Sequence, residues 1–134
     1  YSKKMNIIDE CIVQDFGGET SDATKKALKD SDVMVMQQCL SHMPSDNLTE
    51  WLKIFLQDRT RPKRFIYDHN PFFDSRDMSP EALLKAAGIT QGTWESTHRF
   101  YAYREKTDAE YAESQENGRD MCVNHYVVDF KPSN

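Results

Sequence analysis

The stretch DVMVMQQCLSH, residues 32–42, decides the fold of this chain. Its apolar part, Val33–Met36, has the length of a β-strand and is apolar on both faces, as parallel strands buried on both sides are. Polar residues follow at once, among them Gln37, Gln38 and His42. Ligands of open α/β sheets bind just beyond the carboxyl ends of the strands. We therefore expect a binding or catalytic site at this strand end.

The clearest helix signal follows this stretch. Ser45 is a good N-cap residue, and Pro62 cannot continue a helix and marks its end. Between them, apolar residues recur at the spacing of a core-facing stripe. These residues are Leu48, Trp51, Leu52, Phe55 and Leu56. The sequence therefore predicts an amphipathic helix here, with its apolar face on the core.

Two elements are predicted before residue 32. Two apolar pairs predict a strand over Asn6–Phe16 that ends at Gln14 and the neighbouring acid. A pair of glycines then turns the chain, and Thr20 or Ser21 caps a short helix that runs through Leu28.

The second half of the chain predicts a helix between strands. Phe65–Tyr67 is a short strand, and Ser79 with the following proline starts a helix that Gly88 stops. Two long strand-like segments follow, Trp94–Arg104 and Met121–Phe130. They have no helix between them, which predicts an antiparallel pair at a sheet edge.

The predicted order is β-α-β-α-β-α-β-β, which indicates a Rossmann-like α/β fold with a partly parallel sheet and right-handed crossovers. Aromatic residues alternate in the first strand of the last pair, so we expect Phe100, Tyr101 and Tyr103 to belong to the sheet core. The acidic segment Asp108–Asp120 fits a solvated connection between the two strands.

Length and charge limit the possible classes of protein. The chain has 134 residues, which suit one domain spanning residues 1–134. The formal net charge is −5, and the longest basic run is Arg59–Arg64. This run is too short for binding nucleic acid through counterion release, and a solvated turn explains it.

The three cysteines have no CxxC spacing, which argues against a disulfide framework and a cysteine-rich zinc site. We therefore expect a reducing compartment such as the cytoplasm. No apolar run approaches the roughly 18 residues of a membrane span, so no membrane contact is expected. His42, Asp68 and His69 lack a recognisable ligand spacing, and no metal site is predicted.

Motifs at three predicted strand ends resemble those of a known family. They are Val13–Phe16 (VQDF), Gln37–His42 (QQCLSH) and Tyr67–Asn70 (YDHN), in this order. With three βα units that end in an antiparallel pair, they resemble the C-terminal half of a class I S-adenosylmethionine-dependent methyltransferase. The chain is most similar to the α-N-terminal protein methyltransferases. The string Asp68–Pro71 also resembles the acidic-His-Asn-Pro string of a wider relative.

The resemblance implies roles for the residues at these strand ends. Val13 and Gln14 would lie near the adenine of S-adenosylmethionine, and Gln37 would contact the amino-acid end of this cofactor. His42 and Asn70 would orient the acceptor amine, with Gln38 as a further substrate-binding residue. On this reading, the strand ends of Gln14, Gln37 and Asn70 line one shared crevice.

The resemblance also implies that Asp74 or Asp77 serves as a base or as an anchor for a cation. Simpler structural roles stay open for all of these residues: turn caps, polar strand ends, a helix entry and a solvated loop. His69 and His98 fit ordinary surface or edge positions.

The implied activity is methyl transfer to an amine of a protein N-terminus or of a small molecule. The family's glycine-rich loop and its acidic ribose ligand are absent from these 134 residues. The resemblance therefore implies half of a cofactor site, completed by a longer chain or by another chain. One alternative is a non-catalytic methyltransferase-like module that works within a complex, and another is an unrelated small α/β domain whose strand ends match the motifs by chance. In each case an open parallel edge predicts association with itself or with a partner chain.

Overall fold

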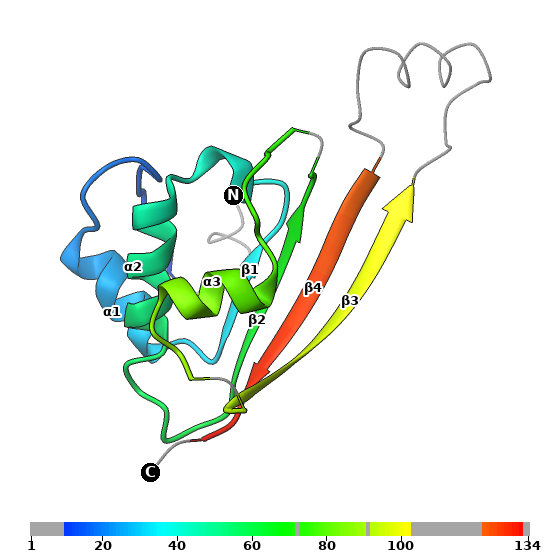
Figure 1. Cartoon of the computed structure of the whole chain (residues 1–134). Helices are drawn as coiled ribbons and strands as arrows, with labels where there is room; N and C mark the ends of the chain where they lie inside the picture. Colours follow the sequence, from blue (N-terminus) through cyan, green and yellow to red (C-terminus); the bar gives the residue numbers. More distant parts are fainter. Residues whose placement is uncertain (1–9, 72, 91, 103–121, 133–134) are drawn as a thin grey trace.

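The computed structural model describes residues 10–71, 73–90, 92–102 and 122–132 (Figure 1). These residues form a mixed α/β fold with a four-stranded sheet, three α-helices and a short 3-10 helix. The elements are α1 (Asp22–Asp30), β1 (Val33–Met36), η1 (Leu40–His42), α2 (Ser45–Phe55), β2 (Lys63–His69), α3 (Pro80–Ala86), β3 (Trp94–Ala102) and β4 (Cys122–Phe130).

The strand order of the sheet is β1-β2-β4-β3. β1 and β2 run parallel, whereas β4 is antiparallel to both β2 and β3. The predicted antiparallel pair of last strands is thus confirmed. Of this pair, only β3 lies at an edge of the sheet, because β4 lies between β2 and β3 (Figure 1). The α/β class is confirmed, with one parallel strand pair in the described sheet.

The strand predicted over Asn6–Phe16 is wrong for its described part, Glu10–Phe16, which is not a strand. The side chain of Gln14 turns toward α1 and accepts hydrogen bonds from the Ser21 backbone N–H and the Thr24 hydroxyl. These bonds hold the segment against the start of a helix, and an isolated strand without a partner has no ladder to stabilise it.

The helix boundaries follow the predicted caps closely. Ser21 caps α1 by accepting a hydrogen bond from Thr24, and Ser79 caps α3, which has a proline in its first turn. Gly88 ends the α3 region with a φ of 76°, which glycine adopts without strain. For α2 the N-cap position is Pro44 rather than Ser45, and the helix ends at Phe55, well before Pro62.

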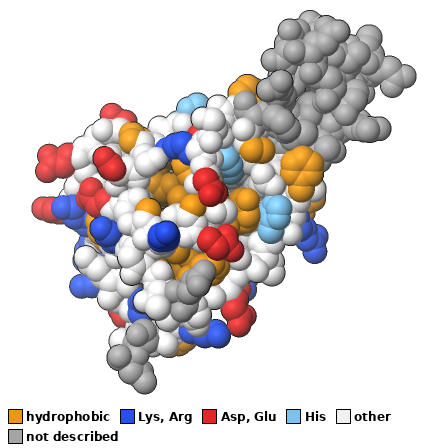
Figure 2. Space-filling view, in the orientation of Figure 1, with side chains coloured by type: hydrophobic (Ala, Val, Ile, Leu, Met, Phe, Trp, Pro, Cys, Tyr) orange, Lys and Arg blue, Asp and Glu red, His pale blue; other side chains and the backbone are white. Residues whose placement is uncertain are grey.

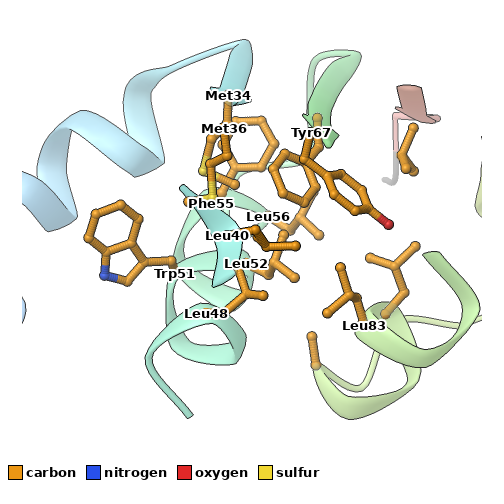
Figure 3. Packing of buried hydrophobic residues seen from close by; sticks show 14 of the residues in the cluster. Met34, Met36, Leu40, Leu48, Trp51, Leu52, Phe55, Leu56, Tyr67 and Leu83 are labelled. Carbon is orange, nitrogen blue, oxygen red and sulfur yellow. The ribbon is translucent and has the colours of Figure 1, made fainter. Parts of the chain in front are cut away.

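The three helices cover one face of the sheet and share one core with it (Figures 1 and 3). The stripe of α2 points into this core, where Leu52 and Phe55 are fully buried. The prediction that Trp51 belongs to the stripe is confirmed, and its indole N–H donates a hydrogen bond to Thr20. Tyr67 of β2 is also fully buried, and its hydroxyl donates to the Met78 carbonyl before α3.

The other face of the sheet has no helix over it in the described part of the chain (Figure 1). The prediction that β1 is buried on both faces is therefore wrong: Met34 and Met36 are buried, but Val33 is 50 % and Val35 56 % exposed. The prediction that Phe100 and Tyr101 of β3 belong to the core is likewise wrong, since Phe100 is 55 % and Tyr101 39 % exposed. Tyr103 and the acidic segment 108–120 lie outside the described residues.

The basic run Arg59–Arg64 lies between α2 and β2 and extends into β2. It was expected to be a solvated turn, but several of its side chains bind other parts of the fold. Lys63 is 2 % exposed and donates hydrogen bonds to the carbonyls of Lys29 and Phe55, near the carboxyl ends of α1 and α2. Arg64 pairs with Asp129 across the sheet. On the face seen in Figure 2, basic and acidic side chains alternate over the helices. The cations of the run thus serve the fold.

Candidate functional site

A pocket of about 640 Å³ lies at the carboxyl ends of β1 and β2. This is the place where the sequence predicted a site, because the loops after parallel strands meet at one end of the sheet. β4 contributes the side chain of Val123, near its amino end. The lining residues are Gln38, Cys39, Leu40, Ser41, His42, Asp68, His69, Asn70, Phe73 and Val123.

A hydrogen bond from the Gln38 backbone to the Asp68 side chain joins the two strand ends at the pocket. The backbone N–H of Gln38 donates to the Asp68 carboxylate over 2.7 Å. Gln38 has a φ of 57°, in the left-handed region that side chains other than glycine seldom adopt. Burial, and then the negative charge of Asp68, raise the pKa of the neighbouring Cys39 thiol. The hydrogen bond to Asp68 thus holds Gln38, in the turn after β1, in its left-handed backbone conformation.

His69 at the end of β2 is a buried residue, and its predicted surface position is wrong. Its Nε2 lies 3.3 Å from Oδ2 of Asp74, outside hydrogen-bond geometry and without another hydrogen-bond partner among the described residues. Asp74 is also buried, so the expected solvated loop position is wrong for this residue. His98, by contrast, lies exposed on the edge strand as predicted, with its Nε2 2.6 Å from the Asn124 side-chain oxygen.

Arg76 holds the carboxylate of Asp74. Its guanidinium donates hydrogen bonds to both carboxylate oxygens, and these bonds are the main reason why the pKa of Asp74 is lowered. The same guanidinium donates to the carbonyls of Leu40 and Met43 and to the Ser45 hydroxyl. Arg76 thus fastens the loop after β2 to η1 and to the start of α2.

Sequence reasoning missed Arg76 and the buried state of His69. The string Asp-Ser-Arg at residues 74–76 is an available signal, because an Asp side chain often accepts a hydrogen bond from the backbone N–H two residues on. Here the Arg76 N–H donates to Asp74. Apart from Asp74, the partners of the guanidinium lie more than 30 residues away, and two of these three are backbone carbonyls. Since every residue has a backbone carbonyl, the sequence pattern does not show which carbonyls will accept hydrogen bonds from Arg76.

The structure brings three of the expected site residues together: Gln38, His42 and Asn70 all line the pocket. Gln37 is exposed at the end of β1 and is not among the lining residues. Asp77 is exposed, accepts a hydrogen bond from the Ser79 N–H before α3, and has its pKa lowered by hydrogen bonds from Ser79.

The residues expected near an adenine lie elsewhere. Gln14 lines a second cavity, of about 280 Å³, with residues of α1 and with Trp51 of α2. Val13 beside it is 95 % exposed. The expectation that the ends at Gln14, Gln37 and Asn70 line one crevice is therefore wrong, because Gln14 does not end a strand and its side-chain amide serves α1.

Comparisons with known proteins return no match: no family model fits the chain, and no curated protein and no solved structure matches it significantly. Within the described ranges, no group of three His, Cys, Asp or Glu residues is placed to hold a metal ion. None of the described helices has the length and apolar character needed to cross a bilayer.

Proposed function

We propose that the chain is a methyltransferase-like domain that positions an acceptor amine, of a protein N-terminus or a small molecule, for transfer of a methyl group from S-adenosylmethionine. One observation carries this proposal. Gln38, His42 and Asn70, from the loops after two neighbouring parallel strands, line the same pocket. These are residues to which the family resemblance assigns acceptor binding.

The charge of the pocket supports an amine as its ligand. Asp68 is the ionisable carboxylate among the lining residues, and no Lys or Arg is among them within the described part of the chain. A phosphate or carboxylate ligand would meet no cation here, whereas an ammonium group or amine finds a carboxylate and side-chain amides. The exposed ring of Phe73 adds an aromatic surface that suits a cation.

S-Adenosylmethionine fits these residues in part. Its sulfonium supplies the reactive methyl group, and the pocket volume lies within the range of roughly 300–1,000 Å³ that is usual for ligand sites. The adenine end finds no described partner at Val13 and Gln14, because the Gln14 side chain is bound to the start of α1. The chain's own residues therefore account for acceptor binding.

An amine attacks as a nucleophile only with a free lone pair, so its proton must leave. Asp74 is a poor proton acceptor, because Arg76 binds its carboxylate and lowers its pKa. Asp77 lies outside the pocket lining. His42 lines the pocket and is exposed, so we assign proton acceptance to His42 and orientation of the amine to Asn70.

Isothermal titration calorimetry with S-adenosylmethionine and S-adenosylhomocysteine tests the proposal on this polypeptide and on any longer natural form. We expect cofactor binding that is unchanged by Thr97→Ala on the exposed edge strand, and binding of an N-terminal peptide amine that is weakened about tenfold or more by Asn70→Ala. Methyl transfer to an N-terminal peptide amine should fall with His42→Ala. Absence of cofactor binding by every form, with the fold intact, would refute the enzyme.

That outcome would favour the second candidate, a non-catalytic methyltransferase-like module within a complex. The exposed valines of β1 are the observation in its favour, since side chains of a strand in a parallel pair are normally covered on both faces. Assays of cofactor binding and of complex formation on the same sample separate the two candidates.

A further inference from the structure

β1 forms an edge of the described sheet and is protected only by its shortness, because its four residues include no charge, proline or bulge. In the part of the chain that the structure describes, β1 pairs with β2 and no strand pairs with its other side. Natural edge strands discourage pairing with charged residues, prolines or bulges. The opposite edge, β3, has Glu95, His98 and Arg99, whereas β1 reads Val33-Met34-Val35-Met36 without a charge.

The exposed side of β1 continues an apolar row across the sheet. Val35 is 56 % exposed and lies opposite Ile66 of β2, which in turn lies opposite Val127 of β4. Ile66 and Val127 are both half-buried. At the nearby charged position, Arg64 and Asp129 neutralise each other at 2.6 Å. The edge and the adjoining face thus present apolar side chains next to backbone N–H and C=O groups with which no described strand pairs.

We propose that the occupant of this edge is a second copy of the chain, paired antiparallel through β1 about a two-fold axis. In this register, Met34 lies opposite the partner's Met34, and Val33 lies opposite the partner's Val35. The two sheets join into one of eight described strands, with both sets of helices on the same side. The proposal goes beyond the proposed function and does not depend on it.

The sequence of β1 is what selects a second copy. A two-fold contact uses the same patch on both chains, so the patch must complement itself. In the proposed register, each valine meets a valine on the outer face and Met34 meets the partner's Met34 on the helix face, and such cross-strand apolar pairs stabilise antiparallel sheets. The neighbouring acid, Asp32, lies opposite the partner's Met36, so no like charges oppose each other.

The size of the contact predicts a weak dimer. Four residues of each chain form β1. Stable specific interfaces bury about 1,200–2,000 Å², and smaller ones belong to weak encounters. We therefore expect a dissociation constant of the dimer between roughly ten micromolar and one millimolar.

Sedimentation velocity of the full chain across this concentration range is the first test. We expect the mean mass to rise toward twice that of the monomer for the wild type and for Thr97→Lys, which places the same charge on the protected edge. Val35→Lys should stay monomeric throughout. A wild type that remains monomeric at the highest concentration, or a Val35→Lys variant that dimerises equally well, would overturn the proposal.

Disulfide trapping then tests the register, in a Cys11→Ser background because Cys11 is exposed. Directly opposite antiparallel residues have Cα atoms about 4.5–5.5 Å apart, which suits a disulfide. We expect oxidation of mixed Val33→Cys and Val35→Cys chains to give the mixed dimer well above either homodimer. Predominant homodimers would contradict the register. Hydrogen exchange adds a check: slow exchange along β1 in dilute monomer would mean that the chain covers its own edge, against the proposal.

Discussion

Nε2 of His69 and Oδ2 of Asp74 lie 3.3 Å apart at the end of β2, and both side chains are buried. Asp74 is shared between this histidine and the guanidinium of Arg76. A buried carboxylate is costly without a partner, so the loop after β2 depends on the arginine. The cluster stands directly behind the pocket, of which His69 is a lining residue.

Arg76→Ala should destabilise the fold substantially, because it leaves the buried Asp74 and the carbonyls of Leu40 and Met43 without this donor. Loss of one partner of a buried pair costs about 3–5 kcal/mol, and the partial exposure of Arg76 reduces our expectation to about 2–3 kcal/mol. Urea denaturation measures the change. Arg64→Ala, which breaks the exposed pair with Asp129, is the matched control and should have a much smaller effect.

Asp74 should make stability fall in acid. The hydrogen bonds from Arg76 lower its pKa in the folded state. Its stabilising contribution is therefore complete above the unfolded pKa of about 3.9 and is lost as the pH falls through the lower folded pKa. We expect the free energy of unfolding of the wild type to exceed that of Asp74→Asn, and this difference should become smaller below about pH 4. Chemical denaturation of both proteins between about pH 2 and 6 measures it. A difference in the free energy of unfolding that stays constant over this pH range would contradict the prediction.

Gln38→Gly should separate stability from ligand binding. The φ of 57° at this residue is strained for glutamine and free for glycine, whereas the N–H that bonds to Asp68 is kept. After the entropic cost of glycine in the unfolded chain, we expect stabilisation of up to about 1 kcal/mol. Thermal unfolding measures this change. Gln38→Ala, which keeps the strain, should not be stabilising, and both variants should lose the binding due to the side-chain amide.

Cys39 should be a slow thiol. Burial and the charge of Asp68 raise its pKa, which reduces the fraction of reactive thiolate near neutral pH. Timed alkylation followed by peptide mass spectrometry should show Cys39 modified later than the exposed Cys11. Asp68→Asn removes the charge and should speed the reaction of Cys39, with that of Cys11 unchanged. Equal rates at Cys39 before and after this substitution would mean that burial alone controls the thiol.

Local features were readable in the sequence wherever the determinant lies within a few residues. Ser21 and Ser79 cap their helices because the hydroxyl reaches an N–H three residues on. The stripe of α2 and the bounds of β1 follow from the spacing of apolar residues, and the position of the pocket follows from the general rule for parallel strand ends.

Contacts between distant segments were decided by tertiary structure. The side chain of Gln14 accepts a hydrogen bond at the start of α1, and the residue does not end a strand. Arg76 donates hydrogen bonds to carbonyls of η1 and of the turn after it. Strand β4 enters between β2 and β3, and the face of β1 that carries Val35 stays exposed in the described part of the chain. The periodicity of a segment shows which side chains are apolar, but not which surface covers them. Hydrogen-bond partners and burial depend on the arrangement of the whole chain, and that is why the sequence located the pocket but not the buried cluster behind it.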